Sequence, residues 1–468
     1  MTECTQRTFD FQGLTRRQIV ADFQGGHLSS DGGGLLLGEV EVQRGWIRDF
    51  SECFDDYRSP LLTEHSVYQL SAQRIIGLAQ GYEDLNDHDL LCRDPLLATL
   101  CGKNDPTGQD RRCPEDRGKP LAGKSTLNRL EHGQGASDRY KKIACRAWEV
   151  EELFVSKFIS RRHRAPRRII LDMDATDDPL HGQQEGRFFH GYYDAYCYMP
   201  LYIFCGSELL CAKLRPSNID ASAGALEEVE RIVAQLRAAW PEVQISLRGD
   251  SGFARDVIMT WCEANEVDYI FGLARNARLE RMLAPAMRST RAWHRLTGQA
   301  ARSFMELKYR THKTWSATRR VVAKAEVLDK GDNPRFVVTS LAAREHPARH
   351  LYEVDYCARG DMENRIKEQQ LDMFADRTST ATLRANQLRL WIASIAYCIV
   401  NDLRELGLKG TRMAKAQCGT IRTRLLKIGA AVSISVRRIL IRMPRSCPFQ
   451  DLFATAICNL RSIRAGAT

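Results

Sequence analysis

The stretch RRIILDMD, residues 167–174, decides how the middle of the chain folds. Its apolar run predicts a buried β-strand. The aspartates that end the run, Asp172 and Asp174, lie two residues apart and therefore on one face of that strand. Burying a carboxylate in such a run is costly unless the group is paired or bound to a metal ion. From these residues alone, a candidate metal site and a pair of acids that merely caps a loop are equally good interpretations.

Four more β-rich runs follow this one: YCYMPLYIF (196–204), ELLCAKL (208–214), VQISLRGD (243–250) and VDYIFGLA (267–274). Apolar residues at helical spacing predict one amphipathic helix after Ser222 and another after Phe253, between the later runs. The resulting order βββαβαβ predicts a mixed sheet covered by helices, a fold of the α/β (α+β) class.

A third acid, Asp250, closes the fourth run, where Gly249 and Gly252 allow the backbone to bend closely around it. The first and fourth strands lie side by side in ribonuclease-H-like sheets, so Asp250 is expected to meet the aspartates of the first run. Metal ions held by carboxylates can activate an attacking oxygen and stabilise a leaving one in phosphoryl transfer. The pattern therefore favours that chemistry.

The fourth acid comes from a predicted helix, YCARGDMENRIKEQQ (356–370). Arg359, Glu363, Lys367 and Gln370 follow one another at spacings that place them along one helical face. Met362 and Ile366 are expected to face the core, whereas Asp361 and Glu368 project elsewhere. Glu363 is therefore the better candidate ligand for Mg²⁺, which prefers oxygen donors.

At these residues the sequence resembles the DDE transposases of bacterial insertion sequences, most closely insertion-sequence family 1380 within the larger group named after insertion sequence 4. The resemblance spans nearly the full chain. It is carried by the blocks LDMDATDDPLHGQQEGRFFHGYYDAYCYMPLYIF, LRPSNID, RGDSGFAR, GLARN, YCARGDMENRIKEQQ and ANQLRL. It implies a ribonuclease-H-like core interrupted by a β-rich insertion, with Mg²⁺, or Mn²⁺ as a substitute, held by Asp174, Asp250 and Glu363.

The resemblance also bears on the first acid and on the glutamate helix. The wider group places its first acid before a small residue and a threonine, which favours Asp174, although Asp172 stays a second candidate metal ligand. The group's signature of Tyr, Arg, Glu and Lys is matched by Tyr356, Arg359 and Glu363, but Gln370 stands at the lysine position. Lys367, one turn earlier, is the alternative phosphate contact. Tyr356, Arg359 and Lys367 are thus candidate DNA-binding residues, and whether excision passes through a hairpin stays open.

Further contacts to DNA are expected outside the acids. In the block HGQQEGRFFHGYYD (181–194), Arg187 and His190 are candidates, with plain loop structure as the alternative. Zinc binding by His181 and His190 is not expected, because no cysteine partners lie at suitable spacing. Trp293 and Trp315 are expected to pack in the core rather than to stack on an unpaired base.

Charge and composition fit a DNA partner and a reduced compartment. The net charge is +10, and from Asn401 onward 13 Lys or Arg face 3 acids, so the tail predicts a phosphate-contacting surface. The 15 cysteines lie mostly in apolar stretches without a C-x-x-C pair. The start lacks a signal peptide, and the most apolar run, Leu390 to Val400, is too short to span a bilayer, so we expect a cytoplasmic, bacterial protein.

The coarse pattern divides the chain into five segments: a mostly helical DNA-binding region (1–160), the first part of the catalytic core (161–274), the β-rich insertion (275–355), the second part with the glutamate helix (356–405) and a basic C-terminal module (406–468). GKSTLNRLEH in the first segment predicts a short helix carrying Asn128 and Arg129, either a DNA-reading helix or an ordinary surface helix. The last segment is expected to contain a hairpin around Gly429 and the alternating stretch VSISVRRILIRM (432–443).

Together these features predict a transposase that binds terminal inverted repeats and target DNA, cuts the ends with the help of metal, and transfers the strand. By resemblance, a homodimer on two paired ends is expected. Two alternatives stay open: a transposase-derived DNA-binding protein without catalysis, and a ribonuclease-H-like nuclease.

Overall fold

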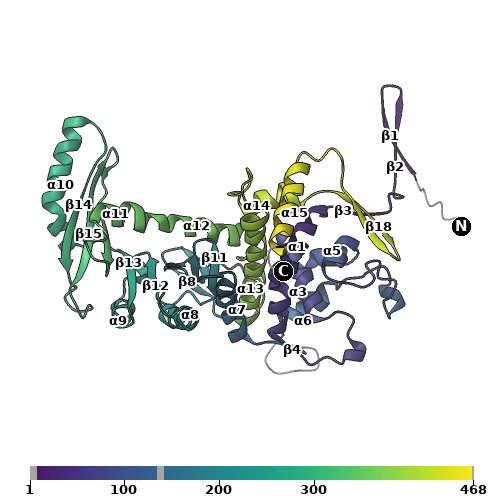
Figure 1. Ribbon diagram of the computed structural model, residues 1–468, viewed down its shortest axis with the longest axis horizontal. Coiled ribbons are helices and arrows are strands. Elements are labelled where there is room, and N and C mark those ends of the chain that lie inside the picture. The colour runs from purple at the N-terminus through teal and green to yellow at the C-terminus, as the bar shows by residue number, and fades with distance from the viewer. Residues whose placement is uncertain (1–7, 134–141, 466–468) are drawn as a thin grey trace. The chain divides into compact units, whose positions relative to one another are not determined.

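The computed structural model describes residues 8–133 and 142–465 (Figure 1). The chain forms two compact units. The terminal unit combines Met1–Cys145 with Ile395–Thr468, and the central unit is Arg146–Ser394. Among the described residues, no helix is both long and apolar enough to cross a membrane.

The central unit is built on one mixed sheet with the strand order β11-β10-β6-β12-β13-β17-β15-β14. The five strands predicted from the sequence are β6 (Arg168–Ala175), β10 (Leu201–Cys205), β11 (Glu208–Lys213), β12 (Gln244–Gly249) and β13 (Val267–Leu273). β10 pairs antiparallel with β6 and β11, whereas β12 pairs parallel with β6 and β13. The predicted class, a mixed sheet with helical cover and ribonuclease-H-like strand order, is confirmed.

Helices cover this sheet because their apolar stripes match its buried faces. α8 (Ala225–Ala239) buries Val229, Val233 and Leu236, and α9 (Asp256–Ala264) buries Ile258 and Cys262. These residues join Leu171 and Leu247 in one hydrophobic core, together with residues of α7 (Ala147–Ser160). Both helices lie where the 3.6-residue periodicity of the sequence predicted them.

The segment expected as a β-rich insertion extends the same sheet. Its strands are β14 (Ala301–Tyr309), β15 (Arg319–Leu328) and β17 (Arg335–Thr339), and β17 pairs antiparallel with β13. Figure 1 shows a long helix, α10 (Ala277–Thr297), lying along β14 and β15. The hydrophobic pattern of the sequence did not predict α10, because this helix is polar, contains Pro285 and buries only a narrow stripe of residues.

The predicted glutamate helix is part of a continuous helical run. The run comprises α11 (Ala348–His350), the π-helical turns η6 (Leu351–Tyr356), the tighter turn η7 (Cys357–Arg359), α12 (Gly360–Lys367) and the π-helical η8 (Glu368–Asp372). Met362 and Ile366 are buried, as predicted from their spacing. Glu368 is also buried and pairs with Arg365 at 2.7 Å, so it points away from the face of Glu363.

The terminal unit joins segments from both ends of the chain. Its helices include α1 (Leu35–Arg44), α2 (Trp46–Glu52), α3 (Val67–Ala79), α5 (Pro95–Leu100), α6 (Lys124–Glu131) and α15 (Gln450–Ala465). The indole nitrogen of Trp46 donates to Asp402 at 2.7 Å, near the end of α13 (Leu383–Asp402). The short strand β3 (His27–Ser29) pairs with β18 (Ala430–Ser435). The helical region and the basic module are therefore parts of one unit.

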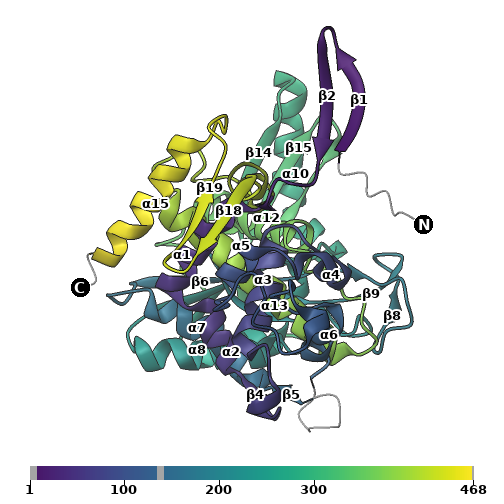
Figure 2. The same ribbon diagram turned by 90° about the vertical axis from the view of Figure 1, so that its right-hand side faces the viewer.

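Two hairpins of the terminal unit differ from expectation (Figure 2). β1 (Thr8–Leu14) and β2 (Arg17–Asp22) form an exposed hairpin in a region predicted to be mostly helical. The predicted C-terminal hairpin exists as β18 and β19 (Arg438–Arg442), but its turn lies at Val436 and Arg437, not around Gly429. The alternation of apolar and polar residues identified the strands, whereas the glycine proved a poor guide to the turn.

Candidate active site

Three of the predicted acids lie on or directly after neighbouring elements of the central unit. In the parallel pair β6 and β12, Met173 lies opposite Gly249. Asp174 directly follows Met173, and Asp250 directly follows Gly249. Both acids therefore stand at the same edge of the sheet. Glu363 comes from α12, whose buried Met362 and Ile366 hold it against the unit.

Arg359 links two of these acids. One guanidinium nitrogen, Nη1, lies 3.3 Å from Oδ2 of Asp174, and Nη2 donates to Oε1 of Glu363 at 2.6 Å. Burial raises the pKa of Asp174 to about 6; the Arg359 charge opposes this, and the charges of Asp250 and Glu363 add to it. The four side chains thus share one electrostatic environment in which three negative groups surround one positive group.

Asp250 is fixed by the turn that follows β12. Its carboxylate caps this turn, η5 (Ser251–Phe253), by accepting from the backbone N–H of Gly252 at 2.8 Å. A Cβ at position 252 would lie 3.0 Å from Oδ1 of the same aspartate, which explains the glycine. Arg255 pairs with Asp220 at 2.8 Å, so the LRPSNID and RGDSGFAR blocks brace one another beside the acid.

A second glycine allows Tyr356 to approach Asp250. A Cβ on Gly272, in β13, would lie 2.6 Å from the Tyr356 hydroxyl and 3.3 Å from the backbone carbon of Asp250. Burial raises the pKa of Tyr356, whereas Arg359 lowers it and Asp250 raises it again. Tyr356 therefore packs among the acids, and the GLARN block supplies the space that it needs.

Asp172, the second candidate for the first acid, already has a full partner. Arg248 on β12 binds it with Nε 2.5 Å from Oδ1 and Nη2 2.8 Å from Oδ2. Both side chains are buried. This role of Arg248 was not predicted from the sequence. The arginine inside the apolar run ISLRGD could have indicated it, because a buried cation needs a partner.

Gln370, at the expected lysine position, and Lys367, the alternative phosphate contact, differ in their surroundings. Gln370 donates from Nε2 to the backbone carbonyl of Asp177 at 2.9 Å, which ties the helical run to the loop after β6. Lys367 is exposed, and in the described part of the chain it has no ion pair. Gln370 thus has a structural role, whereas the charge of Lys367 is available to a ligand.

The block around Arg187 and His190 is an ordered small sheet. It consists of β7 (Asp178–Pro179), β8 (Phe188–His190) and β9 (Ala195–Tyr198). The Arg187 guanidinium donates to the carbonyl of Gly182 and lies 4.1 Å from the Tyr196 ring centre. The His190 ring lies 4.9 Å from that of Tyr193. The block therefore contains short strands as well as loop, and DNA contact by Arg187 and His190 stays a prediction.

This small sheet also exposes aromatic side chains that the sequence reading had not singled out. Phe189 and Tyr192 are 55% and 86% exposed, and Phe188 and Tyr196 are exposed as well. Burial raises the pKa of the neighbouring Tyr193 to about 12, with added contributions from the charges of Asp177 and Asp174. Tyr193, which neighbours this aromatic surface, therefore lies within electrostatic reach of Asp174.

The two tryptophans considered for the insertion have different environments. Trp315 is 5% exposed and packs edge-on against Tyr309, with 5.6 Å between ring centres, so its predicted core position is confirmed. Trp293 is 61% exposed on α10, and its predicted core position is wrong. It lies near the C-terminal end of α10, three residues beyond Thr290, the last buried residue of that helix.

The terminal unit contains a second candidate site, a basic hollow lined by side chains from the part of the chain between residues 58 and 143. The volume of this hollow is about 800 Å³. Three of its lining side chains, Arg93, Arg129 and Lys142, are exposed and have no ion pair within the described ranges. Arg129 belongs to α6, the helix predicted from GKSTLNRLEH. The hollow thus presents three uncompensated cations to a ligand.

The donor atoms at the edge of the sheet suit a hard divalent cation. Asp174, Asp250 and Glu363 offer carboxylate oxygens only, which Mg²⁺ and Mn²⁺ prefer. Burial is the main cause of the raised pKa of Asp174, and the charges of Asp250 and Glu363 add to it even with Arg359 beside the carboxylate. A divalent cation would stabilise the ionised form of this buried group.

The chain is similar to known proteins in sequence and in structure. A family model described as transposase DDE domain group 1 matches residues 11–465. Among solved structures, the chain is similar to a piggyBac transposase synaptic complex with hairpin DNA, with 11% identity, a TM-score of 0.41, and coverage of 84% of this chain and 80% of that chain. No curated protein matches the chain. The match over almost the whole sequence shows that the chain belongs to the transposase DDE domain group 1 family.

Proposed function

We propose that this chain is an active, metal-dependent DDE transposase that binds the terminal inverted repeats of an insertion sequence, cleaves DNA at its ends and transfers the strand to target DNA. The observation that carries the proposal is the cluster of Asp174, Asp250 and Glu363 around Arg359. The sequence blocks of the middle region favour insertion-sequence family 1380 and a bacterial source.

Asp174, Asp250 and Glu363 are the residues that would hold Mg²⁺ or Mn²⁺. When bound, the metal lowers the pKa of an attacking hydroxyl or water and offsets negative charge on the leaving oxygen. Asp172 is not proposed as a ligand, because Arg248 engages both of its oxygens. Asp250 is held by its turn and Glu363 by the buried side of α12, so the chain positions the donors before a ligand arrives.

Arg359 and Lys367 are proposed to bind the phosphates that flank the cleaved bond. Arg359 neutralises the acids in the free protein, and it can exchange a carboxylate for a phosphate oxygen without loss of charge pairing. Lys367 lies one helical turn beyond Glu363 and is exposed. Tyr356 is proposed to position Arg359 and the Asp250 turn from its buried place beside Gly272.

DNA binding is proposed to involve surfaces in each unit. In the central unit, Arg187, His190 and the exposed aromatic rings of the small sheet suit the DNA backbone and an unpaired base near Asp174. In the terminal unit, the basic hollow and the basic C-terminal module suit the phosphates of the repeats. A homodimer on two paired ends is proposed as the working state.

The test is incubation of the full chain with labelled inverted-repeat DNA, target DNA and Mg²⁺. Asp250→Asn and Glu363→Gln are expected to bind the ends as the wild type does but to produce neither cleaved nor joined product. Asp361→Asn is the matched control, because Asp361 is an exposed acid on the same helix. Full strand transfer by either site variant would contradict the assignment.

The same experiment separates the rival functions. A catalytically inactive DNA-binding protein would retain the labelled ends without cutting them at any Mg²⁺ or Mn²⁺ concentration. A ribonuclease-H-like nuclease would cut without joining and would not prefer repeat ends to unrelated DNA. Only a transposase yields joined products that depend on the terminal repeats.

A further inference from the structure

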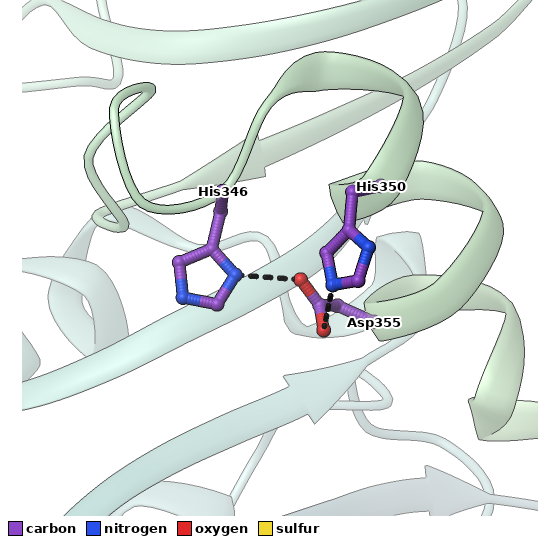
Figure 3. Close-up of side chains that lie close together, drawn as sticks. All are labelled: His346, His350 and Asp355. Atoms are coloured by element: carbon purple, nitrogen blue, oxygen red, sulfur yellow. Dashed lines mark hydrogen bonds and ion pairs between the residues drawn. The ribbon is translucent and has the colours of Figure 1, made fainter.

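A second group of metal-ligating side chains lies just before the glutamate helix. His346, His350 and Asp355 each offer one donor atom, and the three atoms lie within 4.8 Å of one another. Nδ1 of His346 is 2.7 Å from one carboxylate oxygen of Asp355, and Nε2 of His350 is 3.7 Å from the other. Figure 3 shows the carboxylate between the two rings, with one nitrogen of each ring directed towards it.

We propose that His346, His350 and Asp355 form a binding site for a transition-metal cation of the Zn²⁺ class, separate from the carboxylate site that is suited to Mg²⁺. Two imidazole nitrogens and one carboxylate oxygen suit Zn²⁺, which takes three protein ligands and a water in open sites. Around a tetrahedral Zn²⁺ ion, neighbouring donor atoms lie roughly 3.3 Å apart. The three donor atoms would therefore reach this geometry with only small side-chain shifts. The proposal does not rest on the proposed transposase function.

The local environment supports a cation. The His350 side chain is 51% exposed, which leaves room for a solvent ligand, while those of His346 and Asp355 are 12% and 18% exposed and largely fixed. Arg248 donates to the backbone carbonyl of Asp355 at 2.5 Å, but its charge is compensated by Asp172. The Asp355 carboxylate is therefore free of any competing Lys or Arg in the described part of the chain.

The site would act as a brace. Asp355 precedes Tyr356 directly and lies two helical turns before Glu363, while His346 lies in the loop that leads from β17 into the helical run. Arg320, on β15, donates to the carbonyl of His346 at 2.7 Å, so the loop is already attached to the sheet. A bound cation would tie this loop to the turn that carries Tyr356 and would reduce local opening of residues 346–363.

The competing interpretation is a hydrogen-bonded histidine and aspartate that binds no metal. Zn²⁺ titration of tag-free, chelator-treated full chain by calorimetry distinguishes the two. The titration is carried out in an Asp250→Ala background, which disables the carboxylate site. We expect one Zn²⁺ per chain, and His350→Ala is expected to weaken binding by at least about 100-fold, since loss of even an indirect partner of a metal ligand costs 10- to 100-fold.

Two control variants, one further ligand variant and two further readouts complete the design. His312→Ala and Cys357→Ser should bind Zn²⁺ as the parent does, because His312 is an exposed histidine elsewhere and Cys357 is an exposed thiol two residues from Asp355. His346→Ala tests the better buried ligand. Co²⁺ should give visible absorption without the charge-transfer band of a thiolate ligand, and Zn²⁺ should slow hydrogen exchange in residues 346–363.

Two results would overturn the proposal. One is unchanged Zn²⁺ affinity in both His350→Ala and His346→Ala, with each variant folded by circular dichroism. The other is the absence of stoichiometric binding by the parent, which would leave the three residues as a hydrogen-bonded group only. Neither result affects Mg²⁺-dependent cleavage by the wild type, so failure of this site and failure of the proposed function are distinguishable.

Discussion

Arg248 binds both carboxylate oxygens of Asp172 between two adjacent parallel strands, at 2.5 and 2.8 Å, and both side chains are buried. A carboxylate whose two oxygens are engaged in this way is an unfavourable metal ligand, because an incoming cation would have to displace the guanidinium. The neighbouring acid Asp174 has a longer ion-pair contact, 3.3 Å to Arg359, and accepts a hydrogen bond from the backbone N–H of Ala175 at 3.0 Å.

The two aspartates of β6 should therefore respond differently to neutralisation. Asp172→Asn is expected to destabilise the central unit by about 3–5 kcal/mol, because it leaves a buried arginine without its partner. Asp174→Asn should cost little stability but abolish Mg²⁺ binding. Hydrogen exchange of the β6 and β12 amides reports the first effect and calorimetric Mg²⁺ titration the second. A stable Asp172→Asn protein that has lost Mg²⁺ binding would reverse the assignment of the two acids.

Arg359→Ala should strengthen Mg²⁺ binding in the absence of DNA. The guanidinium compensates the charges of Asp174 and Glu363 in the free protein, and its removal leaves the acids to repel one another until a cation binds. Partly exposed ion pairs such as those of Arg359 contribute roughly 0.2–1 kcal/mol. We therefore expect the affinity for Mg²⁺ to rise by up to about fivefold. Cleavage should nevertheless fall, because the phosphate contact is lost. Weaker Mg²⁺ binding in Arg359→Ala would show that the arginine organises the acids rather than competing for them.

Gly272→Ala should impair the site through a steric clash. The added methyl group would lie 2.6 Å from the Tyr356 hydroxyl, and overpacking of this kind typically costs about 1–3 kcal/mol. The double variant Gly272→Ala with Tyr356→Phe removes the clashing oxygen and should recover stability relative to the single variant, as measured by thermal unfolding. Gly360→Ala is the control, since nothing lies within 4 Å of a Cβ there. An equal loss in the single and double variants would mean that the backbone of Asp250 and Ser251, not Tyr356, is the obstacle.

The basic hollow should contribute to the salt dependence of DNA binding. Replacing Arg93, Arg129 and Lys142 together by Ala is expected to reduce the slope of log K against log salt by about 0.9 for each lost phosphate contact. Fluorescence anisotropy with repeat-end DNA at several salt concentrations measures the slope. Arg164→Ala is the control, because Arg164 is exposed in the loop before β6, at the end of that strand opposite the acids. An unchanged slope in the triple variant would remove the hollow from the DNA-binding surface.

The terminal unit should lose stability in mild acid. Burial, together with nearby cations, lowers the pKa of His65 and of His88 to about 3. Below pH 6.5 the unfolded chain binds protons that the folded chain excludes, so the free energy of unfolding falls as the pH decreases from 6.5 towards 3. The slope approaches about 1.4 kcal/mol per pH unit for each histidine.

Hydrogen exchange of the α3 amides between pH 5 and 6.5 tests this, because most carboxylates are still ionised in that window. His65→Gln should flatten the dependence by the share of one histidine. The exposed His312 provides the control substitution. A wild-type unit whose stability does not change over this window would contradict the lowered pKa values.

Much of the central unit was predictable because its residues carry strong periodic signals. The apolar runs that became β6, β10, β11, β12 and β13, and the stripes of α8 and α9, each reflect local geometry that repeats every two or 3.6 residues. α10 gave no such signal, because a long polar helix needs only a narrow buried stripe once β14 and β15 are beside it. The exposed β1–β2 hairpin likewise buries none of its residues, so hydrophobic patterning could not reveal it.

The sequence alone determined the acids and the elements that carry them: aspartates at the ends of two apolar strands and a glutamate on an amphipathic helix. Which acids share one environment was decided by the tertiary structure. Parallel pairing places Arg248 opposite Asp172, and packing of the helical run brings Arg359 to Asp174. The reason is physical: the charge state and availability of a buried carboxylate depend on partners that are distant in sequence, 76 residues away for Asp172 and 185 for Asp174.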